Sequence, residues 1–108
     1  MYNQDNVFYK IINNQIPSDP VMESKYFIAI NDISPKAPTH VLIIPKNSYI
    51  DYYDFITNAK DEEIVDVNKG IAKLIEVVGL VENGYRIVTN SKLFGQQEIM
   101  HVHFHLMG

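Results

Sequence analysis

The apolar and polar positions of the chain follow two periods, which together predict two helices and five strands. Apolar residues recur at helical spacing over residues 6–13 and, more strongly, over 59–78. A period of two, or a short continuous apolar run, marks the extended segments 21–24, 25–30, 40–45, 85–89 and 101–107. Because most of these strands are joined by short turns, the pattern favours an antiparallel sheet with helices on one face, an α+β domain.

The boundaries of these elements come from capping and breaking residues. Asn58 is expected to cap the long helix and Gly79 to end it. Gly70, in the middle of that helix, costs about 1 kcal/mol relative to Ala. Residues 31–40 and 90–97 are predicted to be loops, and residues 46–55 a connection with a short helical turn.

The last predicted strand carries three of the four histidines of the chain, at positions 101, 103 and 105. Successive side chains of a strand point to opposite faces. Val102, Phe104 and Leu106 would therefore face a core, while His101, His103 and His105 form a row on the other face. The row is either solvated on an exposed sheet face, or a metal site, or a catalytic site built from imidazoles.

The spacing of the row bears on the last two alternatives. Three successive i, i+2 residues span about 13 Å, so a single ion cannot readily gather all three without a bulge. A two-histidine metal site completed by His40 or a carboxylate stays open. In the catalytic alternative, a central imidazole attacks phosphorus while its neighbours orient it or donate to phosphoryl oxygens. Asn90 and Gln97, in the preceding loop, could supply further amide donors.

Two residues outside this row allow more than one interpretation. Asp32 could accept hydrogen bonds from the hydroxyls of a ligand, but from sequence alone an Asx-turn onto the backbone is favoured. His40 opens the strand 40–45, where a lone histidine is usually structural or solvated.

Composition limits the classes of partner. The chain has 108 residues, which suits one compact domain spanning 1–108, and a formal net charge of −4 with scattered Lys and Arg. This charge argues against a nucleic-acid polymer, although not against a mononucleotide. Cysteine is absent, so disulfides and thiolate chemistry are excluded. Without an apolar run that could span a bilayer or an apparent secretory signal, we expect no membrane association and a cytoplasmic location.

The segment His101–Met107 resembles the His-φ-His-φ-His-φ-φ signature of the histidine triad (HIT) family, where φ is apolar. The resemblance extends over about residues 7–107. It includes Phe8–Ile12, Ile16-Pro17, Asn31–His40, Ile44–Lys46, Gly84–Arg86 and Asn90. Within the family, the chain is most similar to the nucleotide-binding, phosphoramidase-like branch (Hint, or protein kinase C inhibitor-like).

The resemblance implies a fold, an assembly and a ligand. The fold is a five-stranded antiparallel sheet with one long and one short helix, and two subunits form a homodimer that continues the sheet. The ligand is a purine nucleoside monophosphate or phosphoramidate, and neither a metal nor another cofactor is expected. His103 would be the nucleophile, forming a covalent nucleotidyl-histidine, with His101 and His40 positioning it and His105 contacting the phosphoryl group.

The remaining residues that the resemblance assigns form the nucleotide pocket. Asp32 would bind the ribose hydroxyls and Ile33 would lie beside the ribose, which replaces the turn interpretation of Asp32. The phosphate would be held by Asn90, Gln96, Gln97 and Glu98. The base slot would be lined by Val7, Phe8, Ile11, Ile16, Ile30 and Leu42.

Three departures from the family pattern narrow these expectations. Gln96 stands where relatives usually have glycine, and Glu98 stands where many have serine. Some relatives complete a zinc site with cysteines, which this sequence lacks. Other relatives have longer C-terminal tails that lie near the partner's active site, and this sequence has no counterpart of them after Gly108.

We expect a hydrolase that cleaves the P–N bond of adenosine 5′-phosphoramidates. The alternatives are a dinucleoside polyphosphate hydrolase and a nucleotide-binding module with incidental hydrolysis.

Overall fold

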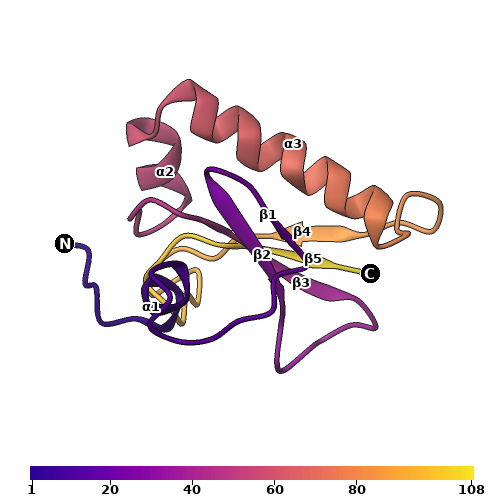
Figure 1. Cartoon of the computed structure of the whole chain (residues 1–108), viewed down its shortest axis with the longest axis horizontal. Coiled ribbons are helices and arrows are strands. Elements are labelled where there is room, and N and C mark those ends of the chain that lie inside the picture. Colours follow the sequence, from indigo (N-terminus) through magenta and orange to yellow (C-terminus); the bar gives the residue numbers. More distant parts are fainter.

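The computed structural model describes all 108 residues, as three helices and one five-stranded sheet (Figure 1). In chain order the elements are α1 (Val7–Ile12), β1 (Met22–Glu23), β2 (Phe27–Asn31), β3 (His40–Pro45), α2 (Tyr52–Asn58), α3 (Asp61–Val77), β4 (Arg86–Val88) and β5 (Phe104–Met107). The strands lie in the order β1-β2-β3-β5-β4, and every neighbouring pair is antiparallel. The predicted α+β fold is confirmed. No helix has the length and apolar character needed to cross a membrane.

Helices cover both faces of the sheet, contrary to the prediction that they lie on one. On one face Val41 and Ile43 of β3 pack in a cluster with residues of α3. On the other face Leu42 and Ile44 pack with Phe8 and other residues of α1. Figure 1 shows α3 and α1 on opposite sides of the strands. The prediction was wrong because β3 is buried along its whole length, so both of its faces exclude water.

The regular part of the histidine strand is shorter than predicted, because β5 begins at Phe104 rather than at residue 101. Its ladder with β3 ends at the pair Ile43–Phe104. Continuing this register would place Val102 opposite Pro45, which has no N–H to donate. Val102 is instead held by a 2.8 Å bond from its own N–H to the Tyr49 carbonyl, and its side chain still joins the α3-facing core.

The boundary between α2 and α3 also differs from the predicted one. The Asp51 carboxylate accepts the Asp54 N–H at 3.0 Å and caps α2, which extends the expected helical turn to Asn58. Asn58 therefore ends α2 instead of capping the long helix. That helix begins at Asp61, where the Glu63 carboxylate accepts the N–H of Lys60 at 3.0 Å.

Gly70 allows α3 to approach the sheet closely. A methyl group built on its Cα would lie 2.3 Å from Cε2 and 2.4 Å from Cζ of Phe27. Phe27 belongs to β2 and is almost fully buried. The absence of a side chain at residue 70 thus makes room for an aromatic ring beneath the helix.

Candidate functional site

A cavity of about 550 Å³ opens on the α1-facing side of the sheet. Its floor includes Leu42, His105 and Val88, which the register places in one row across β3, β5 and β4. Of the predicted site residues, those lining it are Val7, Phe8, Ile11, Ile30, Asp32, Ile33, His40, Leu42, Asn90, Gln96, Glu98, His103 and His105. The volume falls within the range of small-molecule sites.

His103 presents one unprotonated nitrogen in this site. Its Nδ1 lies 2.7 Å from the backbone carbonyl of His101, so Nδ1 carries the proton and donates it. In a neutral imidazole the other nitrogen, Nε2, then keeps its lone pair. Phe8 of α1 packs against this ring edge to face, with 4.8 Å between the ring centroids. The side chain is 7% exposed, which excludes the solvated row that the sequence left open.

His101 lies behind His103 and does not line the cavity. It is completely buried, and its Nε2 lies 2.6 Å from the Pro45 carbonyl, to which it donates. Its contribution to the site is made through its own carbonyl, which accepts the Nδ1 proton of His103. The structure therefore places His101 as a support for His103 rather than as a ligand contact.

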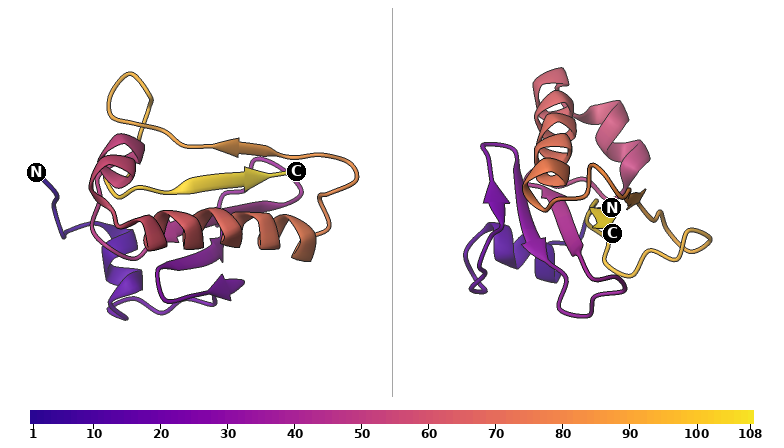
Figure 2. Two further views of the ribbon diagram at one scale, coloured as in Figure 1. Left: turned by 90° about the horizontal axis from the view of Figure 1, so that it is seen from above. Right: turned by 90° about the vertical axis from the view of Figure 1, so that its right-hand side faces the viewer.

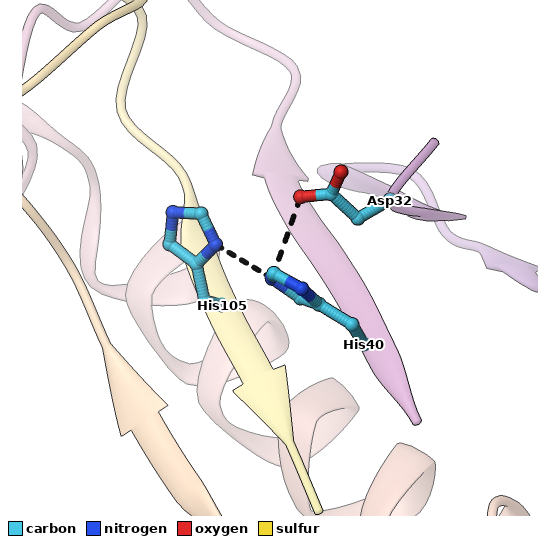
Figure 3. A group of neighbouring side chains, drawn as sticks. All are labelled: Asp32, His40 and His105. Atoms are coloured by element: carbon cyan, nitrogen blue, oxygen red, sulfur yellow. Dashed lines mark hydrogen bonds and ion pairs between the residues drawn. The ribbon is translucent and has the colours of Figure 1, made fainter. Parts of the chain in front are cut away.

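His40, His105 and Asp32 form a second hydrogen-bonded group at the cavity (Figure 3). The Lys36 backbone N–H donates to Nδ1 of His40 at 3.1 Å, so the proton of neutral His40 sits on Nε2. That proton is directed at Nδ1 of His105, at 2.8 Å, with the Asp32 carboxylate 3.4 Å away. His105 accepts at Nδ1, and its own proton therefore lies on Nε2.

Asp32 satisfies both interpretations that the sequence allowed. Its Oδ1 accepts the Ser34 N–H at 2.8 Å, which is the Asx-turn, while the residue also lines the cavity. The turn fixes the carboxylate next to His40. The Asp32 side chain therefore both closes the turn and faces the cavity.

The same three residues resemble a metal site, since one ligand atom from each of Asp32, His40 and His105 lies within 4.8 Å of the others. A metal would have to bind the lone pair of His40 Nε2. The N–H of Lys36 occupies Nδ1, and this leaves Nε2 protonated in the neutral ring. The tautomer of His40 therefore suits a hydrogen-bond donor better than a metal ligand.

Burial keeps the three triad histidines neutral. It lowers the pKa of His101 to about 4, and it also lowers the pKa of His103. The carboxylates of Asp32 and Glu98 oppose that effect on His103, as does its bond to the His101 carbonyl. Burial, followed by the repulsion that protonated His103, protonated His40 and Lys36 would exert on a second positive charge, lowers the pKa of His105 to about 4 against the attraction of Asp32. Neutral imidazoles are what a nucleophile and its hydrogen-bonded supports require at neutral pH.

The loop between β4 and β5 brings amide side chains to the cavity and projects beyond the sheet (Figure 2). The Asn90 amide donates one N–H to the Gly95 carbonyl at 2.8 Å, and its second N–H remains available. Gln96 lines the cavity with a φ of 60°, a left-handed conformation that glycine adopts more readily. This agrees with the family preference for glycine at that position.

Two predicted contact residues lie elsewhere. Gln97 is buried and braces its loop, because its amide donates to the carbonyls of Ile50 and Ile99 and accepts the N–H of Lys92. Ile16 packs at the edge of the α1 cluster without reaching the cavity. Long-range backbone contacts, which a sequence pattern does not reveal, occupy the Gln97 side chain.

Sequence reasoning missed two cations of the cavity, Lys36 and Arg86. Neither forms an ion pair within the chain. Arg86 pairs with Met107 across β4 and β5, and its guanidinium lies 3.7 Å from the Met107 sulfur. The alternation of strand 85–89 alone would have placed Arg86 and Val88 on one face.

The histidines give a testable dependence of stability on pH. The pKa values of His101 and His105 are about 4 in the fold and 6.5 when unperturbed, so between these values the unfolded chain binds more protons. We therefore expect the free energy of unfolding to fall as the pH is lowered from about 6.5 towards about 4. Urea denaturation at several pH values measures it, and His105→Asn should show a shallower dependence. A free energy of unfolding that does not change over this pH range would contradict the lowered pKa values of His101 and His105.

Comparison with known proteins agrees with this site. The HIT domain family model matches residues 13–108. An uncharacterized HIT-like protein of Rickettsia prowazekii is 45% identical over 108 residues, covering 100% of this chain and 90% of that protein. The purine nucleoside phosphoramidase of Escherichia coli is 39% identical over 105 residues, covering 97% and 87%. A solved HIT family hydrolase of Legionella pneumophila superposes with a TM-score of 0.88 at 39% identity, covering 96% and 92%. The chain therefore belongs to the histidine triad family, as its motif predicted, and its relatives include hydrolases.

Proposed function

We propose that this protein hydrolyses the P–N bond of purine nucleoside 5′-phosphoramidates through a covalent nucleotidyl intermediate on His103. The observation that carries the proposal is the tautomer of His103, whose Nδ1 proton is held by the His101 carbonyl so that Nε2 is free to attack. The similarity to a purine nucleoside phosphoramidase supports the same substrate class.

The cavity has separate regions for the parts of such a substrate. The apolar side chains of Val7, Phe8 and Ile11 suit a flat base, and Asp32 suits the ribose hydroxyls. The phosphoryl group then lies between Nε2 of His103, the N–H of His105 and the free amide hydrogen of Asn90. Donors aimed at phosphoryl oxygens stabilise the charge that develops during transfer.

The reaction takes two steps. In the first, a bond forms between Nε2 of His103 and phosphorus as the P–N bond breaks, and the departing nitrogen takes up a proton from solvent while the Nε2–H of His105 donates a hydrogen bond to it. In the second, water attacks phosphorus, the bond to His103 breaks, and the proton lost by the water returns to solvent. The products are the amine and the nucleoside monophosphate.

A second candidate, a dinucleoside polyphosphate hydrolase, is favoured by the two unpaired cations Lys36 and Arg86 at the same cavity. An anionic leaving phosphate would be stabilised there, whereas a departing amine needs a proton instead. A fluorogenic adenosine phosphoramidate and a diadenosine polyphosphate should be tested side by side. Faster amine release supports the phosphoramidase, and faster phosphoanhydride cleavage supports the second candidate. AMP binding without turnover of either would contradict both.

We also propose that two copies form a homodimer through α3 and the edge strand β4. A mostly apolar groove between these elements includes Ile71, Ile75, Ile87 and Phe104. Ile87 is 47% exposed on a strand that has a free edge. Pairing β4 with a second β4 would satisfy that edge and cover the groove. Sedimentation equilibrium tests the proposal, and a monomer at micromolar concentrations would contradict it.

The role of Asp32 can be tested by replacing one oxygen of its carboxylate with an amide nitrogen and by removing the two ribose hydroxyls of the ligand. Asp32→Asn keeps an oxygen for the Ser34 turn but removes the charge that would accept the ribose hydroxyls. We expect AMP to bind about tenfold more weakly, in line with a hydrogen bond to a charged group. A 2′,3′-dideoxy analogue should bind both proteins equally. Equal weakening for the two ligands would instead indicate a disturbed loop.

A further inference from the structure

The first residues of the chain reach the histidine triad. The hydroxyl of Tyr2 lies 2.5 Å from Nδ1 of His101, across 99 residues of sequence. The two rings also meet edge to face, with centroids 5.5 Å apart. The position of Tyr2 is fixed by Asn6, whose amide donates to the Tyr2 oxygen at 3.0 Å and to the Asn3 carbonyl at 2.8 Å.

The direction of the Tyr2 bond follows from the other nitrogen of His101. That nitrogen, Nε2, donates to the Pro45 carbonyl, so Nδ1 of the neutral ring has no proton and must accept. The Tyr2 O–H therefore donates, while the Tyr2 oxygen accepts from Asn6. Both nitrogens of a completely buried imidazole are thus satisfied in a single tautomer and a single orientation.

We propose that Tyr2 is a positioning residue for the triad, whose hydroxyl fixes His101 and, through it, the nucleophilic His103. The connection is direct, because the carbonyl of His101 holds the Nδ1 proton of His103. Asn6 joins the same chain of bonds to α1, since its side chain accepts the Tyr9 N–H and caps that helix. One helix cap thereby supports both the base slot and the triad.

The Tyr2 bond also opposes protonation of His101. A donor aimed at Nδ1 stabilises the neutral ring, in the same direction as the burial that lowers its pKa. The titratable side chains that face His101 are Tyr2, from the N-terminal segment, and His103, from its own segment. Its other neighbours, Phe8 of α1 and the Pro45 carbonyl of β3, are uncharged.

Tyr2 and Asn6 lie before residue 13, where the match to the HIT family model begins, whereas His101 lies inside it. The support of His101 by Tyr2 is therefore not implied by the family motif.

A spectroscopic comparison tests the proposal without any substrate. Imidazole ¹⁵N spectra of Tyr2→Phe should show altered Nδ1 and Nε2 shifts for His101. Tyr9→Phe is the matched control, because the Tyr9 ring lies 6.2 Å from that of Tyr2 and its hydroxyl makes no hydrogen bond within the chain. A His101 spectrum unchanged in Tyr2→Phe, or changed equally in Tyr9→Phe, would overturn the proposal.

A kinetic comparison rests on the proposed function. For the phosphoramidate, kcat of Tyr2→Phe should fall about three- to tenfold with KM unchanged, as one lost hydrogen bond implies. The acid limb of its pH profile should move to higher pH, because His101 protonates more easily. An unchanged kcat and profile would overturn the proposal. If no substrate is turned over even by the wild type, the proposed function fails while the spectra still decide the role of Tyr2.

Discussion

Replacing His103 with alanine is expected to lower kcat for an adenosine phosphoramidate by at least about 10⁴-fold. The reason is that His103 Nε2 is the unprotonated ring nitrogen that the structure leaves free in the cavity. Without a nucleophile the reaction cannot be divided into two displacements. Stopped assays of amine release measure the loss. Samples quenched in alkali, in which a nucleotidyl-histidine is stable, should show the adduct by mass spectrometry only in the wild type.

Two controls separate chemistry from folding in this experiment. The alanine variant should still bind AMP, since the apolar slot and Asp32 do not depend on the imidazole. His105→Asn should retain the adduct while forming it more slowly, because it removes a donor and not the attacking atom. Residual turnover within tenfold of wild type in His103→Ala would assign the nucleophile to another residue.

Gly70→Ala is expected to destabilise the fold by about 2 kcal/mol, although helix propensity alone favours alanine by about 1 kcal/mol. The added methyl group would lie 2.3 Å from a ring carbon of Phe27, which is 1% exposed and cannot move aside. Overpacking of this kind costs up to about 3 kcal/mol and so outweighs the propensity. Urea denaturation measures the difference, and Gly70→Val should cost more.

A second substitution tests whether Phe27 is the cause. Combining Gly70→Ala with Phe27→Leu should cost less than the sum of the two single changes, since the smaller side chain leaves room for the methyl group. The difference between Lys69→Ala and Lys69→Gly, at an exposed position of the same helix, supplies the helix-propensity contribution alone. Strict additivity of the two changes would show that the contact does not limit the packing.

Local patterns predicted the parts of the fold that local chemistry decides. The strand at residues 40–45 was placed correctly, because a short apolar run ending at proline has few alternatives. The alternation around Phe104 and Leu106 correctly assigned them to the core and the histidines to the opposite face. Family resemblance then supplied the functional reading of Asp32 and His40, and the structure places both of them at the cavity.

The features that were missed depend on contacts between distant segments. Gln97 looked like a phosphate ligand, but the carbonyl of Ile50, 47 residues away, occupies its amide. The partner of His101 is Tyr2, and no period or motif connects the two ends of a chain. Asn58 was a chemically reasonable helix cap, yet Asp51 started a helix earlier and left Asn58 at its end.

The bond between His101 and Pro45 has a consequence for how this chain can change by mutation. The ladder between β3 and β5 ends at Ile43, and beyond it the Pro45 carbonyl accepts a hydrogen bond from the His101 imidazole instead of from a backbone N–H. Selection for a folded sheet and selection for support of His103, the proposed nucleophile, therefore act on the same side chain. Most substitutions of His101 are expected to reduce the amount of folded, soluble protein more than the activity of each folded molecule. Library screens that report activity alone will therefore overstate the chemical importance of His101.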